Sequence, residues 1–183
     1  MRLRRVVPGL KLDDDDFTLF GLQRRQRLER SDIDARWRQL QSATHPDRFA
    51  AEGAAAQRIA MQWAVRVNEA HQRLKDPLRR AAYLCELNGV PIDAERNTAM
   101  PKEFLMQQMQ WRETLDDAKA LPDVEVIEGE VMALEQSLLQ DVQQRLDEQG
   151  DTAGAATQVR ALMFVRRFRQ DIERRLDVLD TMR

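Results

Sequence analysis

Cysteine is nearly absent from this chain, and that scarcity excludes two classes of small protein. The only one is Cys85 among 183 residues, so no internal disulfide and no zinc site built on paired cysteines can form. Cys85 lies in the apolar run formed by Ala81, Ala82, Leu84 and Leu87, and we expect it to be buried as a small hydrophobic residue. A chain without disulfides suits a reducing cytosol, and we expect a cytoplasmic protein.

Long hydrophobic runs and an excess of one charge are also missing. No apolar stretch reaches the length needed to cross a bilayer, and we expect no membrane association. The formal net charge of −2 gives no general attraction to nucleic acid. Residues 1–14 begin basic and then meet the acidic run 13–16, which is untypical of a targeting peptide. We expect a flexible arm over 1–14, with the four aspartates solvated and Asp16 or a neighbour capping a helix near Phe17.

Good helix formers are plentiful, and their apolar members recur with helical spacing. Before residue 45 the stripe contains Ile33, Trp37 and Leu40. After it a second stripe runs over about five turns, through Ala56, Ala60, Trp63, Val67, Ala70 and Leu74. Two amphipathic helices joined by a short polar loop predict an antiparallel hairpin. Trp37 and Trp63 fall on the stripes and are expected to face each other in its core.

The loop between these stripes is the tripeptide His45-Pro46-Asp47. Pro46 fixes its own φ and moves the preceding residue out of the α region, so His45 should mark the end of the first helix. A His and an Asp without a nucleophile, metal ligands or a pocket do not form an active site. The tripeptide therefore indicates a contact point at the hairpin tip. An ordinary helix–helix loop and an acid–base pair are the alternatives.

The second half of the chain, 100–183, contains three further amphipathic patterns. The middle one has a heptad-like spacing, through Val124, Ile127, Val131, Leu134, Leu138, Val142 and Leu146. Leu121-Pro122-Asp123 and Gln149-Gly150-Asp151 separate the patterns. Three amphipathic helices with short connections predict an antiparallel three-helix bundle. The expected fold class is thus all-α.

The first helix of this bundle carries more apolar surface than one core stripe needs. Phe104, Trp111 and Leu115 cluster on one side of the helical wheel. Leu105, Met106 and Met109 project about 100–200° away, on the side of Glu113. Phe164, on the last helix, also lies off the centre of its stripe. Because methionine repacks readily, this surplus favours a binding surface, and a contact with the N-terminal half is the alternative.

The order of segments resembles a known family. FTLFGL at 17–22, a helix, His-Pro-Asp, and VNEAHQRLKDPLRRAAYL at 67–84 resemble the J domain of DnaJ co-chaperones, over roughly 15–88. With the bundle that opens with FLM at 104–106, the chain resembles HscB, the J-type co-chaperone of bacterial iron–sulfur cluster biogenesis, over about 15–180. The expected organisation is an arm at 1–14, a J domain at 15–89, a linker at 90–99 and a scaffold-binding bundle at 100–183.

The resemblance implies two binding surfaces. His45, Pro46 and Asp47 would dock on a DnaK-class chaperone, called HscA in that family, and stimulate its ATP hydrolysis. Arg38 and Arg48 would add electrostatic support, and Arg36 is an open case. The bundle would bind the cluster scaffold protein, IscU, and deliver it to the chaperone. The scaffold-binding positions implied are Leu105, Met106, Met109, Glu113 and Phe164.

Several expectations are negative. The resemblance implies no catalytic residue, no metal ligand and no cofactor in this chain, which we expect to be a monomer. Gln110 replaces an acidic residue common in the family, and Thr44 replaces the usual aromatic before the tripeptide. A general J-domain co-chaperone that presents unfolded clients is the alternative function. An enzyme using His45 and Asp47 is the remote one.

Overall fold

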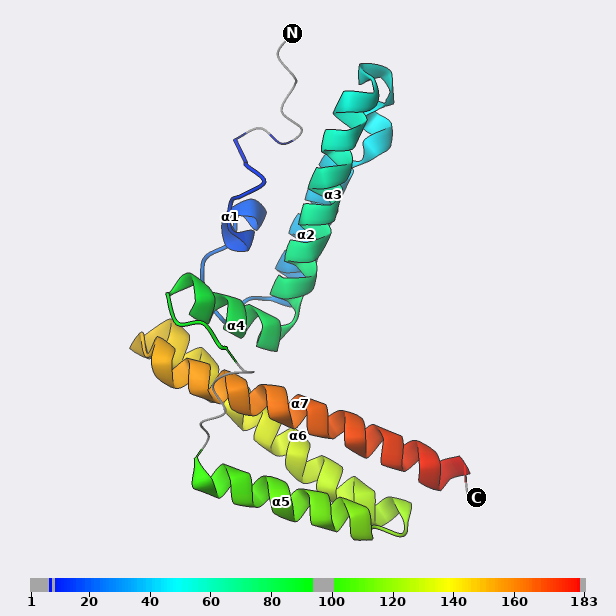
Figure 1. Cartoon of the computed structure of the whole chain (residues 1–183). Coiled ribbons are helices and arrows are strands. Elements are labelled where there is room, and N and C mark those ends of the chain that lie inside the picture. Colours follow the sequence, from blue (N-terminus) through cyan, green and yellow to red (C-terminus); the bar gives the residue numbers. More distant parts are fainter. Residues whose placement is uncertain (1–6, 8, 94–100, 182–183) are drawn as a thin grey trace. The chain divides into compact units, whose positions relative to one another are not determined.

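A computed structural model describes residues 7, 9–93 and 101–181, and the secondary structure in this part of the chain is helical throughout (Figure 1). This confirms the all-α class. The contacts divide the chain into two compact units, Met1–Tyr83 and Leu84–Arg183. None of the helices in the described ranges is long and apolar enough to cross a membrane.

The first unit is built on a helical hairpin. It contains α1 (Asp16–Phe20), α2 (Arg30–Thr44), the 3-10 helix η1 (Pro46–Glu52), α3 (Ala54–Lys75) and the start of α4 (Pro77–Leu87). α2 and α3 pack side by side, and η1 joins them at one end of the pair (Figure 1). The interior is apolar and draws on all of these elements: Phe17, Leu19, Phe20, Ile33, Phe49, Trp63, Val67, Ala70, Leu74, Leu78 and Ala81 are buried.

The expectation that both hairpin tryptophans are core residues is right for one of them. Trp63 is buried, whereas Trp37 is half-buried at the edge of the α2–α3 contact. Trp37 stacks on His71 with ring centroids 4.6 Å apart, and its indole N–H donates to Asn68 Oδ1 at 2.9 Å. An indole whose N–H has a polar partner at the surface does not need full burial. Trp37 therefore closes the rim of the core.

The acidic run is not solvated throughout. A neighbour of Asp16 caps α1, as expected: Asp15 is the N-cap, and its side chain accepts hydrogen bonds from the backbone N–H groups of Phe17 and Thr18. Asp16 is fully buried and forms ion pairs with Arg66 at 2.7 Å and Arg73 at 3.3 Å. A buried carboxylate needs such partners because the interior solvates it poorly. Asp16 thus ties α1 to α3.

The second unit contains a three-helix bundle. α5 (Lys102–Asp117), α6 (Leu121–Gln144) and α7 (Thr152–Thr181) pack together, with a π-helical turn, η2 (Arg145–Gln149), before α7 (Figure 1). One apolar cluster spans the three helices and consists of Trp111, Leu115, Ala118, Val124, Ile127, Val131, Val165, Phe168 and Ile172. Trp111 and Phe168 stack in it, with centroids 5.7 Å apart.

Cys85 lies within this second unit as a packed side chain. It is fully buried, and burial raises the pKa of its thiol to about 11. A thiol that stays protonated is a poor nucleophile and a poor metal ligand. The expectation of a buried, apolar role for Cys85 is confirmed.

Candidate interaction surfaces

The tripeptide lies where the hairpin changes direction. α2 ends at Thr44, and His45 takes an extended conformation with φ −61° and ψ 126°. Pro46 then opens η1, where its fixed φ suits the first position and its missing N–H costs no hydrogen bond. The expectation that His45 marks the break is confirmed. Phe49 anchors the turn, because its buried ring packs with Ala56 and Ala60 of α3.

The two polar side chains of the tripeptide point to solvent. His45 Nδ1 accepts a hydrogen bond from the Asp47 backbone N–H at 3.4 Å, and the same nitrogen lies 3.6 Å from Asp47 Oδ2. The Asp47 side chain is 88% exposed. A carboxylate so exposed keeps its hydration and can exchange it for a partner's donors. The geometry is that of a contact point on a firmly packed turn.

The predicted supporting arginines differ in their surroundings. Arg48 is exposed and reaches back to α2, donating to the Ser42 carbonyl at 3.1 Å, which satisfies a carbonyl of the last helical turn. Arg36 donates to Gln39 at 3.2 Å on the same helix. Arg38 is exposed on α2, and the structure shows no bond from it to any described residue. Arg38 and Arg36 are thus available as positive charge along the outside of α2.

The surplus apolar residues of α5 are exposed. Leu105, Met106 and Met109 are 44%, 61% and 72% accessible, far above the values for the bundle core. Phe104 and Phe164 are half-buried and meet edge to face, with centroids 5.9 Å apart and rings inclined by 83°. Phe164 therefore lies at the contact of α7 with α5, and Glu113 is exposed on α5. We call Leu105, Met106, Met109 and Phe164 the apolar surface.

Comparisons with known proteins bear on both surfaces. A family described as the HSCB C-terminal oligomerisation domain matches residues 100–173, which contain the apolar surface. A "Co-chaperone protein HscB homolog" of Burkholderia thailandensis is 46% identical over 177 residues, covering 93% of this chain and 99% of that protein. One of the same description from Bordetella pertussis is 45% identical, over 87% and 94% of the two chains.

The chain belongs to the HscB family. HscB proteins are co-chaperones of iron–sulfur cluster biogenesis and are not enzymes, which confirms the co-chaperone role predicted from the sequence. Two solved structures agree. The HscB chaperone of Vibrio cholerae superposes with a TM-score of 0.79 at 35% identity, over 91% of this chain and 99% of that one. Human HscB superposes with a TM-score of 0.86 at 25% identity, over 94% and 87%.

Arg112 is a neighbour of the apolar surface that the helical-wheel argument missed. Its guanidinium lies over the Phe164 ring, 5.6 Å from the centroid, in the geometry of a cation–π contact. Sequence held one hint, because Arg112 follows Met109 by three residues and so shares its side of α5. The phenyl ring belongs to another helix, and the contact needs the packing of α5 against α7.

Proposed function

We propose that this co-chaperone links two partners, a cluster scaffold protein of the IscU type and a DnaK-class chaperone of the HscA type. The bundle binds the scaffold, and the hairpin tip docks on the chaperone and accelerates its ATP hydrolysis. The protein acts as a cytoplasmic monomer. The observation that supports this most directly is that the two sets of exposed residues belong to different units, so that neither partner occupies the other's binding residues.

The residues that contact the chaperone are His45, Pro46 and Asp47, and Arg38 and Arg48 support this contact. His45 and Asp47 are exposed, whereas the turn that carries them is anchored by the buried Phe49. A rigid turn binds with little ordering of its backbone, which lowers the entropic cost of association. The charges of Arg38 and Arg48 attract an acidic face and speed the encounter.

Changing the tripeptide tests the chaperone side. We expect His45→Gln or Asp47→Asn to abolish most of the stimulation of ATP hydrolysis, measured under single-turnover conditions with the HscA-type chaperone. Stability should change by less than about 0.5 kcal/mol, since both side chains lie at the surface. Glu52→Gln is the matched control, an exposed acid at the end of the same 3-10 helix. Stimulation equal to that of the unmodified protein would refute this role.

The scaffold side rests on the apolar surface. Exposed methionine and leucine side chains around a half-buried phenylalanine have the composition of an adaptable anchor cluster. Glu113 adds a carboxylate at its edge. A general J protein would bind denatured polypeptides broadly, whereas this surface should select a folded scaffold.

Truncating the apolar surface tests the scaffold side. We expect Leu105→Ala, Met109→Ala and Phe164→Ala together to weaken scaffold binding by at least a hundredfold in titration calorimetry, because each anchor contributes about 1–2 kcal/mol. A double variant of Val126→Ala and Met132→Ala, exposed apolar residues of α6, is the control.

Melting and client binding complete the test. Wild-type scaffold affinity in the triple variant would reject the surface. A collapse of its melting temperature would show that the three residues form a structural contact within the protein. Broad binding of denatured polypeptides by the unmodified protein would favour the general J-protein function.

A further inference from the structure

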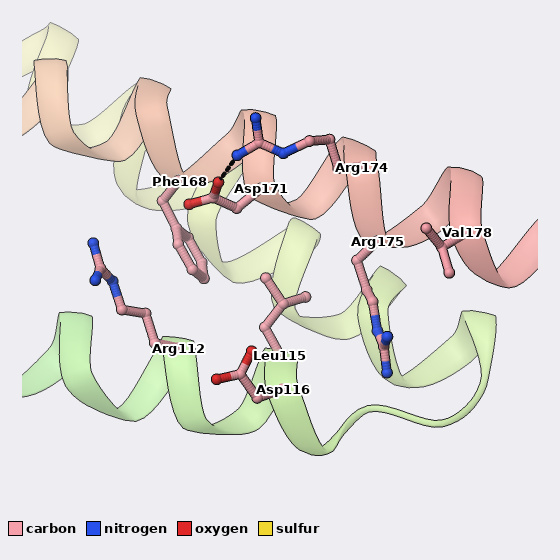
Figure 2. A pocket seen from close by; sticks show the side chains of 8 residues that line it. All are labelled: Arg112, Leu115, Asp116, Phe168, Asp171, Arg174, Arg175 and Val178. Atoms are coloured by element: carbon pink, nitrogen blue, oxygen red, sulfur yellow. Dashed lines mark hydrogen bonds and ion pairs between the residues drawn. The ribbon is translucent and has the colours of Figure 1, made fainter.

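A groove runs along the second unit beside the apolar surface, between α5 and α7. It has a volume of about 510 Å³ and is open to solvent (Figure 2). Leu115 and Phe168 of the bundle core close its floor and are themselves buried, whereas Val178 is an exposed apolar residue of the lining. Its walls carry charged side chains from both helices. We call this feature the α5–α7 groove.

The groove continues the apolar surface. Phe104 meets Phe164 and, further along both helices, Trp111 meets Phe168, so α5 and α7 run in the same direction. On α5, Leu105, Met109, Arg112 and Asp116 recur at intervals of three or four residues and therefore share one face. Arg112 joins the two regions directly, since it covers the Phe164 ring and also lines the groove.

Three of the charged residues in the groove, all on α7, already have partners. Arg174 is paired with Asp171, one helical turn away on α7 (Figure 2). Arg175 donates to the Ala118 carbonyl at 2.5 Å and so closes the end of α5 against α7. These bonds engage the charges on the α7 side of the groove. They leave the charges of α5 to decide what the groove accepts.

Those charges are Arg112 and Asp116. Both are exposed, and the structure shows no ion pair between either of them and a described residue. They are four residues apart on one helix, yet Figure 2 shows the two side chains standing apart over the groove. An exposed arginine and an exposed aspartate that do not pair with each other can each bind an opposite charge on a partner.

We propose that the α5–α7 groove is a second, charge-selective part of the scaffold-binding surface. It receives a segment of the same scaffold protein that places an acidic side chain on Arg112, a basic side chain on Asp116 and an apolar side chain against Val178, the exposed apolar residue of the groove. The inference rests on the function proposed above and assigns the scaffold a further point of contact. Continuity with the apolar surface and the order of the two charges select this occupant.

Such a contact would supply specificity. Apolar anchors bind many apolar partners, whereas an ordered pair of opposite charges rejects a partner whose charges are absent or reversed. The groove thus gives a physical reason why this bundle would choose a folded scaffold over an unfolded client. It also predicts that salt weakens scaffold binding, because exposed charges are screened.

Charge reversal in the full-length protein tests the proposal. We expect Arg112→Glu and Asp116→Lys each to raise the Kd for the purified IscU-type scaffold about tenfold at low salt, and by much less at high salt. The matched controls are Arg167→Glu on α7 and Glu125→Lys on α6, exposed residues that do not line the groove, and their Kd should stay within about twofold. Arg112 contacts the Phe164 ring and Asp116 does not, so Asp116→Lys tests the groove without removing that cation–π contact.

The outcomes separate this proposal from the one before it. If groove variants bind like the unmodified protein while the triple variant of the apolar surface does not, the groove has no part in binding. If the triple variant also binds normally, the scaffold surface itself is elsewhere. Groove variants that alter self-association in sedimentation velocity but not scaffold affinity would assign the groove to a second copy of the chain. A reversed charge on the scaffold that restores binding to Arg112→Glu would identify the acid that the groove receives.

Discussion

Replacing Asp15 by alanine should remove the N-cap of α1 together with an ion pair. One carboxylate oxygen accepts the N–H groups of Phe17 and Thr18 at 3.0 and 3.1 Å, and the other lies 2.7 Å from Arg24. Burial alone would raise the pKa of Asp15, but the hydrogen bonds from Arg24 and Thr18 outweigh it and lower the pKa from 3.8 to about 2. Since a change of one in pKa corresponds to about 1.4 kcal/mol, the ionised form contributes roughly 2 kcal/mol.

The sign of the pH dependence follows from the lowered pKa. Above the unfolded value near 4 the contribution is fully present, and it is lost as the pH falls toward 2. Urea unfolding followed by tryptophan fluorescence, in a Trp111→Phe background, reports the first unit through its own two tryptophans. We expect Asp15→Ala to cost roughly 2 kcal/mol at pH 7 and about half of that at pH 3.

The control for this experiment comes from the same acidic run. Asp13 is exposed, so Asp13→Ala should leave the urea midpoint unchanged at both pH values. An equal loss of stability for Asp15→Ala at pH 7 and pH 3 would show that the carboxylate acts only as an uncharged cap. No loss at pH 7 would refute the capping role itself.

The remaining predictions concern the packing of the hairpin. Trp63→Ala should lower the free energy of unfolding by about 3–5 kcal/mol, because removing the buried indole leaves a cavity. Trp37→Ala should lower it clearly less, because Trp37 is half-buried and stacks on His71. Equal urea midpoints for the two variants would contradict this ranking. Gly53→Ala should destabilise the first unit by about 1–3 kcal/mol, since φ 93° and ψ 170° form a conformation nearly restricted to glycine, and a melting curve matching that of the unmodified protein would contradict it.

The helices and their order could be read from the sequence because apolar periodicity is a local signal. Ile33 on α2 and the stripe of α3 are buried as their spacing predicts, and the end of α2 at His45 follows from the steric effect of Pro46. Trp37 shows what apolar periodicity does not predict. The helical wheel gives the direction of a side chain but not how far the facing helix extends, and the edge position of Trp37 depends on His71 and Asn68, more than 30 residues away.

Asp16 shows a second limit. Its sequence neighbours are acidic, and nothing local distinguishes it from Asp13, which is exposed. The fold brings Arg66 and Arg73 of α3 to its two carboxylate oxygens and buries it completely. A charge is buried only where an opposite charge is placed beside it, and that placement is a property of the tertiary structure.

The two features of α5 illustrate the same distinction within one helix. The exposed side formed by Leu105, Met106 and Met109 could be predicted, because one helix has one inward face and the surplus must point elsewhere. The groove could not be, because its floor and walls combine Leu115 with Phe168, which lies 53 residues further along the chain. In the sequence, Arg112 and Asp116 look like ordinary solvated charges. Only the packing of α7 beside α5 shows that they line a groove. A charge-selective surface of this kind therefore becomes visible only when the register of two helices is known, even where each helix is evident from its sequence.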